Sequence, residues 1–412
     1  MEKILENINL KNIDKSNWES HSFEKIASSI SERVEPTQTD LEIYVGLEHL
    51  DPEDIHIRRF GKREDVSGTK LRCYPGDVIF GRRRAYQRKA AVVNFDGFCS
   101  AHSLVLRPNP KVIDPQLFPF FLHSDQFMHR AVDISVGSLS PTINWGTLKK
   151  EKFILPPKDQ QARLASLLWA MDEVMERVLI LSQKLKQSYD TASFKYILGR
   201  ERLTESNNPK LINSDLGLLP IDWNLVRFKE VADLIHGYQF REHDFTKTGI
   251  PIVKIGEIGK EGNLNLSNCT FIDRIRLDEF ENRILKNGDI LMALTGATLG
   301  KICRVSDLSE PVLQNYRVGK FEPHSSLLDK SYLFHFLSSP MGLTQILGKI
   351  HQAAQGNIGK SDIEELKIPL PPLEEQRLIG KRLDLILEKK GAIEKKMFIS
   401  KALQKSLINQ IF

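Results

Sequence analysis

The chain has 412 residues, of which 41% are hydrophobic and 27% are charged, a composition typical of a globular protein long enough for two or three domains. Its 58 basic and 53 acidic residues leave a formal net charge of +5, which does not by itself identify a nucleic-acid-binding protein unless the cations cluster. No run of about 18 apolar residues and no Cys-x-x-Cys pair is present, so the sequence predicts no membrane span, zinc site or disulfide framework, and we expect a cytoplasmic protein.

The chain carries two copies of one pattern, offset by 205 to 215 residues. Three pairs of segments recur in the same order, and the offset grows along the chain, as small loop insertions in the second copy would produce. We therefore predict a two-copy architecture. The paired segments are Trp18-x4-Phe23 with Trp223-x4-Phe228, residues 75–79 (PGDVI) with 287–291 (NGDIL), and 155–161 (LPPKDQQ) with 370–376 (LPPLEEQ).

Each copy begins with short runs of β-branched and aromatic residues that glycine, proline and asparagine separate, a pattern typical of strands joined by tight turns. Helical stretches at 116–130 and 332–349 follow these strands. The sequence therefore predicts a mixed α and β domain in each copy. The expected strands lie at 42–45, 77–80 and 90–93, and at 252–255 and 289–292.

Each copy ends in a segment that predicts a long helix, at 156–199 and at 371–412, because two prolines suit a helix start and no further proline follows until Pro209 in the first copy and none in the second. About 40 residues at 1.5 Å each give a rod of about 60 Å. Heptad spacing over four repeats favours a coiled coil, and the alternative is a pair of amphipathic helices packed on their own domains. The predicted seam positions are Leu164, Leu167, Met171, Val174, Val178, Leu181, Leu185, Ser188 and Ala192 in the first helix, and Ile379, Leu383, Ile386, Lys390, Ile393, Met397, Ser400, Gln404, Leu407 and Ile411 in the second.

An antiparallel pair of helices suits the linker at 200–219. In a parallel pair this linker would have to span the whole rod, which is close to the limit of about 20 extended residues. We therefore predict an α+β protein with two pseudo-repeated mixed α/β domains separated by a long antiparallel two-helix coiled coil, and we expect Phe412 to return to the first domain.

The sequence does not predict an active site. Residues 296–302 (GATLGKI) resemble a phosphate-binding loop but are one residue short and end in isoleucine where a magnesium ligand should stand. No Gly-x-Gly-x-x-Gly motif is present, and the histidines are isolated. We expect no catalysis by this chain and no metal or cofactor bound to it.

A dense cluster of cations follows a strand in the first domain. Residues 81–89 contain five cations and no carboxylate, and such density suggests that a polyanion meets the loop, the alternative being a solvated surface loop. Arginine, glutamine and tyrosine are side chains that contact phosphates, base edges and sugars in DNA complexes. The candidate DNA-binding residues are Arg82, Arg83, Arg84, Tyr86, Gln87, Arg88 and Lys89.

The matching loop of the second domain is small-residue-rich instead of basic. Glycines there would let backbone N–H groups approach a phosphate. Two nearby runs, at 314–317 and 352–357, add amides and an arginine that could read bases. The candidates are Thr295, Thr298, Lys301, Gln314, Asn315, Arg317, Gln352, Gln355 and Asn357.

The chain resembles the specificity subunit of type I restriction–modification systems. The resemblance rests on the doubled Pro-Pro-x-x-Glu/Gln-Gln helix starts at 156–161 and 371–376, on the run 286–291 that leads into the turn at 295–301, and on the segments 358–372, 219–223 and 44–47. The resemblance covers essentially the whole chain. The first domain departs from it, since an arginine-rich loop replaces the Thr-Gly-x3-Gly-Lys pattern.

The resemblance implies two target-recognition domains, at 1–155 and 220–370, one helix after each, and a split double-stranded DNA target with one half-site per domain. It also implies partners: modification subunits, expected to be two, that use S-adenosylmethionine, and a restriction subunit, an ATP-dependent translocase and nuclease, so that ATP and Mg²⁺ are expected in partners alone. A stand-alone enzyme acting on nucleic acid and a coiled-coil scaffold that binds no DNA are the alternatives.

Overall fold

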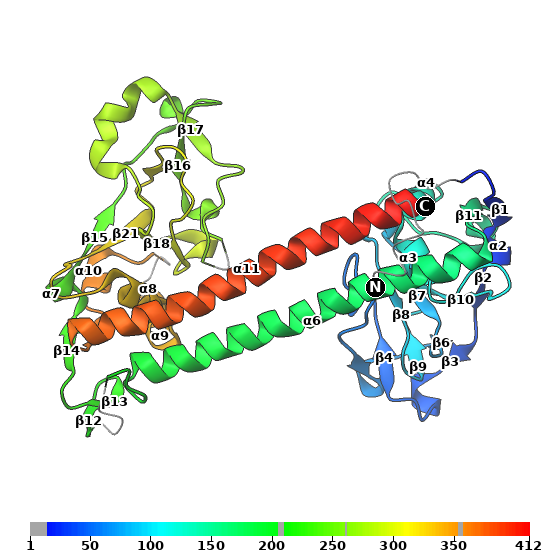
Figure 1. The fold of residues 1–412 in the computed structure, drawn as a ribbon, viewed down its shortest axis with the longest axis horizontal. Helices are drawn as coiled ribbons and strands as arrows, with labels where there is room; N and C mark the ends of the chain where they lie inside the picture. The colour runs from blue at the N-terminus through cyan, green and yellow to red at the C-terminus, as the bar shows by residue number, and fades with distance from the viewer. Residues whose placement is uncertain (1–14, 205–209, 260–261, 353–356) are drawn as a thin grey trace. The chain divides into compact units, whose positions relative to one another are not determined.

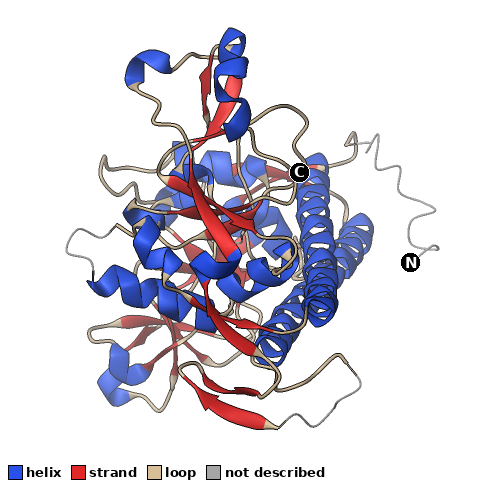
Figure 2. Ribbon diagram, turned by 90° about the vertical axis from the view of Figure 1, so that its left-hand side faces the viewer, coloured by secondary structure: helices blue, strands red, loops and turns tan. Residues whose placement is uncertain are grey.

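The computed structural model describes residues 15–204, 210–259, 262–352 and 357–412. The chain divides into two compact units, which are treated separately below. Unit 1 consists of Met1–Ile180 and Glu394–Phe412, and unit 2 of Leu181–Ile393. Both units contain helices and strands, so the predicted α+β class is confirmed (Figure 2).

Unit 1 has three sheets, with strand orders β1-β11, β2-β10-β7-β8 and β3-β6-β9-β4-β5. Helices α3 and α4 follow the strands, where the sequence predicted one helix at 116–130. The strands are β1 (Glu19–Ser22), β2 (Ala27–Ile30), β3 (Arg33–Val34), β4 (Ile43–Val45), β5 (Gly61–Lys62), β6 (Lys70–Cys73), β7 (Val78–Gly81), β8 (Ala90–Val92), β9 (Gly97–Cys99), β10 (Ser103–Pro108) and β11 (Lys152–Leu155). The short helices are α2 (Phe23–Ile26), η1 (Pro36–Gln38), η2 (Arg63–Asp65), η3 (Ala85–Gln87), α3 (Phe118–His123), α4 (Asp125–Asp133) and α5 (Trp145–Leu148).

Unit 2 has sheets with strand orders β12-β13, β14-β22, β15-β21-β18-β19 and β17-β16-β20. The strands are β12 (Leu211–Ser214), β13 (Gly217–Pro220), β14 (Asn224–Arg227), β15 (Ala232–His236), β16 (Ile250–Val253), β17 (Thr270–Ile272), β18 (Ile290–Ala293), β19 (Ile302–Arg304), β20 (Leu313–Gln314), β21 (Val318–Pro323) and β22 (Lys367–Leu370). The short helices are α7 (Phe228–Val231), η4 (Glu242–Asp244), η5 (Ile255–Glu257), η6 (Arg274–Arg283), η7 (Gly296–Thr298), α8 (Lys330–Ser338), α9 (Pro340–Gln352) and α10 (Lys360–Glu364).

The two units repeat one topology. The sheet β2-β10-β7-β8 has its counterpart in β15-β21-β18-β19, and the pair β1-β11 has its counterpart in β14-β22. Each unit also contains one parallel strand pair, β4 with β9 and β16 with β20. The prediction of two copies from the sequence is therefore confirmed at the level of strand order.

The repeated motifs fill matching places in the two folds. Phe23 and Phe228 each begin a one-turn helix and are completely buried in their own cores. Asp77 and Asp289 are buried at the end of a turn whose glycine has a φ of about +90°, and each carboxylate accepts a hydrogen bond from the backbone N–H three residues before it. These motifs therefore build the fold.

Two long helices connect the units along the chain. Helix α6 (Lys158–Ile197) begins in unit 1 and ends in unit 2, and α11 (Leu373–Ile411) begins in unit 2 and ends in unit 1 (Figure 1). In unit 1 the start of α6 packs against the end of α11 through Leu164, Leu168 and Ile411. Phe412 lies against Phe121 with ring centroids 5.2 Å apart, as predicted.

In unit 2 the end of α6 packs in one hydrophobic core with the start of α11. Tyr196 and Ile197 belong to the same buried cluster as Ile379 and Leu383. Because each unit joins the beginning of one long helix to the end of the other, the helices pair in the antiparallel sense within each unit.

The predicted seam holds for α11 and holds in part for α6. All ten predicted positions of α11 are buried or half-buried. In α6, however, Val174 and Leu181 are both 46% exposed, whereas Leu168 is completely buried and Met175 and Leu179 are half-buried. Six of the nine predicted positions of α6 are buried or half-buried, whereas 174, 181 and 188 are exposed and the residues one position later, Met175, Ser182 and Tyr189, are covered. One half of the α6 seam is therefore shifted by one residue, because the broad apolar stripe of this helix allowed either set.

The segment predicted as a linker at 200–219 contains a two-stranded hairpin. Strands β12 and β13 pair antiparallel, with Leu211 opposite Pro220 and Ser214 opposite Gly217. Arg202, which precedes the hairpin, is buried and forms ion pairs with Asp222 at 2.9 Å and Glu375 at 2.6 Å. This part of the chain is consequently anchored to the start of α11. Among the helices of the described residues, none is both long and apolar enough to cross a bilayer.

Candidate nucleic-acid interface

The arginine-rich segment of unit 1 forms a tight loop between β7 and β8. Gly81 N–H donates to the carbonyl of Lys89 at 2.9 Å and closes the base of the loop. Within it, Arg84 and Arg88 flank the single turn η3 and both adopt the left-handed conformation, with φ of 53° and 54°. The backbone thus turns twice within five residues and directs neighbouring side chains to different sides.

Two of the predicted DNA-binding cations serve the fold. The Arg88 guanidinium is largely buried, forms ion pairs with Asp125 at 2.8 Å and Glu53 at 3.1 Å, and donates to the carbonyl of His123 at 2.7 Å. Lys89 donates through Nζ to the carbonyl of Leu47 at 2.7 Å. Both cations therefore have partners within the fold that come from segments distant in sequence, and a DNA contact of either residue stays a prediction.

The other cations of the loop remain available to a ligand. Arg83 and Arg84 are exposed, Gln87 is half-buried, and Tyr86 is 56% exposed. Arg82 is half-buried, and its Nε is a buried donor with no hydrogen-bond partner within the described residues. Arg83 and Arg84, which are exposed, can therefore pair with an anion that is not part of this chain.

Two residues that the sequence reasoning missed lie near the arginine loop. Burial and the nearby charges of Arg83, Arg82 and Lys70 lower the pKa of His102, which favours its neutral form. The charges come from separate segments, since Lys70 is on β6 and His102 precedes β10. No local pattern could have revealed this, because strand pairing alone joins the segments.

A second loop of unit 1, residues 136–142, is fastened to the arginine loop. Arg84 N–H donates to the carbonyl of Pro141 at 2.8 Å, and Ile143 N–H donates to the carbonyl of Arg82 at 3.0 Å. Arg83 and Thr142 form an isolated antiparallel bridge. Sequence reasoning had assigned no role to this loop.

The matching turn of unit 2 is well satisfied internally. The N–H groups of Leu299, Gly300 and Lys301 donate to carbonyls at 3.0, 2.9 and 3.0 Å, and the Thr298 hydroxyl donates to the carbonyl of Ile255 at 3.0 Å. These three N–H groups are therefore not free for a phosphate, contrary to the expectation for this turn. Thr295 and Lys301 are half-buried beside it.

Gln314 and Asn315 were predicted to read bases, and the structure contradicts both. Gln314 is 1% exposed, and its amide donates to the carbonyls of Ile235 at 2.9 Å and Val318 at 2.7 Å. Asn315 is 5% exposed and accepts from the N–H of Arg317 at 3.2 Å. Both amides shape the chain around them and do not face solvent.

Arg317 is exposed and, with two tyrosines, forms the available part of this site. Its Nε donates to the hydroxyl of Tyr316 at 2.7 Å. Tyr238, which is 44% exposed, is joined to Tyr316 and Gln314 by backbone hydrogen bonds of 2.9 Å. The close contact between this segment and the backbone of Gln314 requires glycine at 237, since a Cβ there would lie 2.0 Å from the carbonyl oxygen of Gln314. The sequence reasoning missed Tyr238 because it lies far from the other residues in the chain.

The last three candidates are Gln352, Gln355 and Asn357. Asn357 is exposed, and the next residue, Ile358, donates its N–H to the carbonyl of Leu294 at 3.1 Å. This bond matches the one from Ile143 to Arg82 in unit 1. Gln355 lies outside the described residues, as does the side chain of Gln352.

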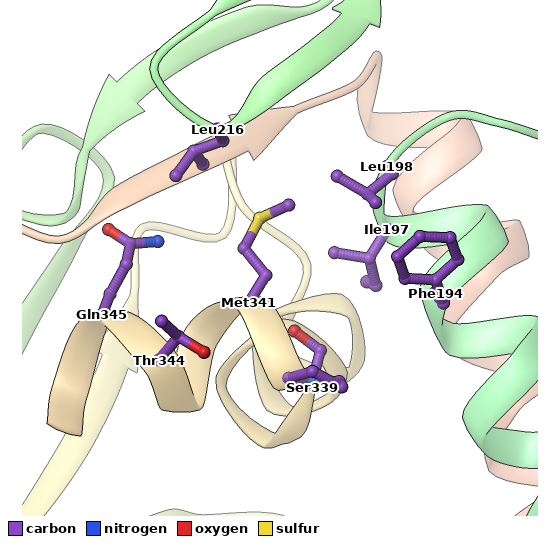
Figure 3. Close-up of a pocket in the computed structure, with 9 residues that line it drawn as sticks. Phe194, Ile197, Leu198, Leu216, Ser339, Met341, Thr344 and Gln345 are labelled. Atoms are coloured by element: carbon purple, nitrogen blue, oxygen red, sulfur yellow. The ribbon is translucent and has the colours of Figure 1, made fainter. Parts of the chain in front are cut away.

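A cavity of about 330 Å³ in unit 2 does not have the chemistry of an active site. Met341 extends from α9 toward Leu216 and the end of α6 (Figure 3). Carboxylates, histidines and cysteines do not occur among its lining residues, and the described part of the chain contains no cluster of three or more potential metal ligands. The lining residues are Phe194, Ile197, Leu198, Leu216, Ser339, Pro340, Met341, Thr344 and Gln345.

Comparison with known proteins gives a consistent result. Residues 220–399 match the family described as the Type I restriction modification DNA specificity domain. The MjaVIII specificity subunit of Methanocaldococcus jannaschii is 28% identical over 61% of this chain and 58% of its own length. The EcoBI specificity subunit of Escherichia coli is 24% identical over 79% of this chain and 69% of its own.

Solved structures share the fold. A type I restriction–modification S subunit from M. genitalium superposes with a TM-score of 0.64 at 15% identity, over 99% of this chain and 98% of its own. A chain from a structure of a type I R-M system gives a TM-score of 0.51 at 20% identity, over 96% of both chains. The resemblance predicted from the doubled Pro-Pro helix starts is thus confirmed.

Proposed function

We propose that this chain is the DNA-reading specificity subunit of a type I restriction–modification complex, since residues 220–399 match the family described as the Type I restriction modification DNA specificity domain. In that role it recognises the DNA sequence, while modification and restriction subunits carry out the reactions that depend on S-adenosylmethionine, ATP and Mg²⁺. The observation that carries the proposal is that each unit exposes arginine and tyrosine side chains together: Arg83, Arg84 and Tyr86 on the β7–β8 loop of unit 1, and Tyr238 and Arg317 beside β20 in unit 2.

The target is split, with one half-site for each unit. The support is the repeated topology, since two copies of one fold with different loop side chains suit two different short sequences. Arg83, Arg84 and Tyr86 serve the first half-site, and Tyr238 and Arg317 serve the second. For two-headed readers, half-sites about one helical turn apart, or about 34 to 36 Å between centres, are the expected spacing.

The experiment is a measurement of DNA affinity against salt concentration for the complex with its modification subunits. Replacing Arg82, Arg83 and Arg84 together by alanine should weaken binding and reduce the salt slope by about one unit for each lost phosphate contact. The replacement Arg63→Ala, on the same unit but outside the loop, is the matched control. Unchanged affinity and slope in the folded triple variant would contradict the proposed interface.

The modification subunits dock on exposed apolar positions of α6 and α11. The apolar residues Leu168, Met175, Leu179, Leu387 and Leu403 lie outside the seam that the sequence predicts, which makes them candidates for this role. In the structure Leu168 is buried in the seam, Met175, Leu179 and Leu387 are half-buried, and Leu403 is 60% exposed. The large apolar side chains of the two helices that are exposed are Val174, Ile180, Leu181 and Phe194 on α6 and Leu378, Leu385, Phe398, Ile399 and Leu403 on α11.

Docking can be tested by co-purification. Replacing Phe398 and Leu403, which are 76% and 60% exposed, by serine should abolish co-purification with the modification subunit and leave the thermal unfolding of the chain alone unchanged. Replacing the exposed charged neighbours Lys395 and Lys401 by serine should change neither. Retained co-purification in the Phe398 and Leu403 variant would remove this surface from the proposal.

Helix length provides a test of the split target. Deleting four residues within 174–185 shifts the heptad register and should change or abolish the tolerated spacer without changing either half-site sequence. A continuous recognition sequence, or a spacer indifferent to the deletion, would contradict a split target. DNA cleavage or methylation by the isolated chain would favour a stand-alone enzyme, and absence of specific DNA binding by the complex would favour a scaffold.

A further inference from the structure

The tip of the loop at 136–142 in unit 1 exposes a leucine almost completely. Leu139 is 93% exposed, and Ser138, which precedes it, is also exposed. Single exposed leucines are common on proteins, and exposure alone assigns no role. The attachment of this leucine to the arginine loop is what distinguishes it.

The loop is a small closed hairpin. The N–H groups of Val136 and Thr142 each donate to the other residue's carbonyl, at 3.1 and 3.0 Å, and the Thr142 hydroxyl donates to the carbonyl of Ser140 at 3.0 Å. Gly137 allows the turn with a φ of +109°. Leu139 is therefore presented on a hairpin that its own hydrogen bonds close.

The hairpin stands directly on the cationic cluster. Arg84 N–H donates to Pro141, Arg83 bridges Thr142, and Ile143 N–H donates to Arg82, so three consecutive arginines are fixed to the base of the hairpin. An apolar tip fastened to a cationic segment suits a DNA duplex, because the arginines can hold the phosphates while the tip enters the groove between them.

Resting on the proposed function, we propose that Leu139 is a specificity-determining residue of unit 1 that contacts the 5-methyl group of a thymine in the major groove. Leucine can neither donate nor accept a hydrogen bond, so it cannot distinguish base edges by polar contacts. The thymine methyl is the apolar group that the major groove presents, and contact with it is one of the ways in which side chains read sequence.

The corresponding place in unit 2 carries different chemistry. The hydrogen bond from Ile358 to Leu294 matches that from Ile143 to Arg82, which aligns residues 353–357 (AAQGN) with 138–142. Alanines and amides there, in place of an exposed leucine, fit two units that read different half-sites.

The test combines a protein change with the removal of one methyl group from DNA. The two half-sites are first defined by selection from randomised duplexes with the complex of this chain and its modification subunits. Each thymine of the half-site lost on changing Arg82–Arg84 is then replaced by deoxyuridine, which lacks only the 5-methyl group. One such replacement should weaken wild-type binding about fourfold, the value of burying one methyl group.

In the variant Leu139→Ala the same deoxyuridine replacement should have no effect, and the selected half-site should lose its preference at that position. The variant Ile275→Ala, a residue of unit 2 that is 87% exposed, should keep the wild-type response at the first half-site. A wild-type complex indifferent to every deoxyuridine, or equal sensitivity in Leu139→Ala, would overturn the inference.

The experiment distinguishes a failure of the proposed function from a failure of the role assigned to Leu139. If the complex selects no sequence at all, the proposed function fails. If selection is intact and Leu139→Ala reads the same half-site as the wild type, the function stands and the assignment of Leu139 fails. If the leucine bends the duplex as a wedge between base steps, fluorescence transfer across the site would fall in Leu139→Ala without any deoxyuridine effect, which would also contradict a methyl contact.

Discussion

Gln376 makes in unit 2 the same three hydrogen bonds that Gln161 makes in unit 1. Each amide Nε2 donates to the carbonyl five residues earlier, Pro156 or Pro371, at 2.8 Å, and to a second carbonyl, that of Val112 or Leu327, at 3.0 Å. Each Oε1 accepts from the N–H of an aspartate, Asp114 at 2.6 Å or Asp329 at 2.8 Å. The last glutamine of the Pro-Pro motif therefore ties the start of each long helix to the loop before α3 or α8.

Replacing Gln161 or Gln376 by alanine should destabilise the unit that contains it by about 2 to 3 kcal/mol, because buried backbone groups lose their partners. The controls are Asp159→Ala and Glu374→Ala, exposed residues of the same motifs. Chemical unfolding of each variant measures the difference. Equal stability of Gln161→Ala and Asp159→Ala would contradict the structural role of the motif.

Arg88 should matter for stability and not for DNA contacts. Changing it to alanine removes the ion pairs with Asp125 and Glu53 and the hydrogen bond to the carbonyl of His123, although Glu53 keeps its ion pair with Lys405, so the change should cost about 1 to 3 kcal/mol of unfolding free energy. Arg83→Ala, at an exposed position, should leave stability within about 0.5 kcal/mol of the wild type and reduce the salt slope of DNA binding. The reverse pattern would show that the division of the loop into structural and binding cations is mistaken.

Because part of the α6 seam is shifted, replacing different leucines of this helix by alanine should reduce the unfolding free energy by different amounts. Leu168→Ala should cost about 2 to 5 kcal/mol, because the side chain is completely buried beside Ile408 and Ile411. Leu181→Ala, at a position that is 46% exposed, should cost well under about 1 kcal/mol. Denaturant titrations distinguish the two, and a larger loss at Leu181 would support the register predicted from the sequence.

Stability of unit 1 should fall in mild acid because of His123. Burial lowers the pKa of His123 to about 4, and the ring is hydrogen-bonded to the carbonyl of Ala90 at 2.7 Å. The unfolded chain takes up a proton below about pH 6.5 while the folded chain resists it, so stability is lost as the pH falls from about 6.5 to about 4, by up to about 3 kcal/mol.

The variant His123→Gln, which cannot titrate, should lose this part of the pH dependence of unfolding. His129→Gln, at an exposed position, provides the control. Unfolding free energies measured between pH 4 and 7 give the comparison. Identical slopes for the wild type and His123→Gln would refute the assignment.

Glycine at 237 should be required for the second half-site. A Cβ in Gly237→Ala would lie 2.0 Å from the carbonyl oxygen of Gln314, so the backbone that carries Tyr238 must shift. We expect preference at the second half-site to weaken at least tenfold while the first is retained. Gly146→Ala, where no atom lies within 4 Å of the added carbon, should change neither.

The sequence by itself determined the repeat, the strands that follow hydrophobic alternation and the two long helices. The spacing of Asp77 and Asp289 after their glycines, and of Gln161 and Gln376 after their prolines, was visible because these residues bond to backbone within a few positions of themselves. Local geometry produces local patterns, and two copies of a pattern confirm each other. The seam of α11 could be read for the same reason, since its apolar positions fit one register.

The tertiary structure decided which polar residues are free. Arg88 and Arg83 stand five residues apart in one basic run, yet the former is held by Asp125 and Glu53 while the latter is exposed. From the sequence alone, Gln314 and Arg317 are equally good candidates for contacting bases, but Gln314 is buried in the folded chain. The desolvation and pairing of a charged or amide group depend on segments that arrive from elsewhere in the chain, and for that physical reason no local pattern of residues could separate the groups that hold the fold from those left to bind DNA.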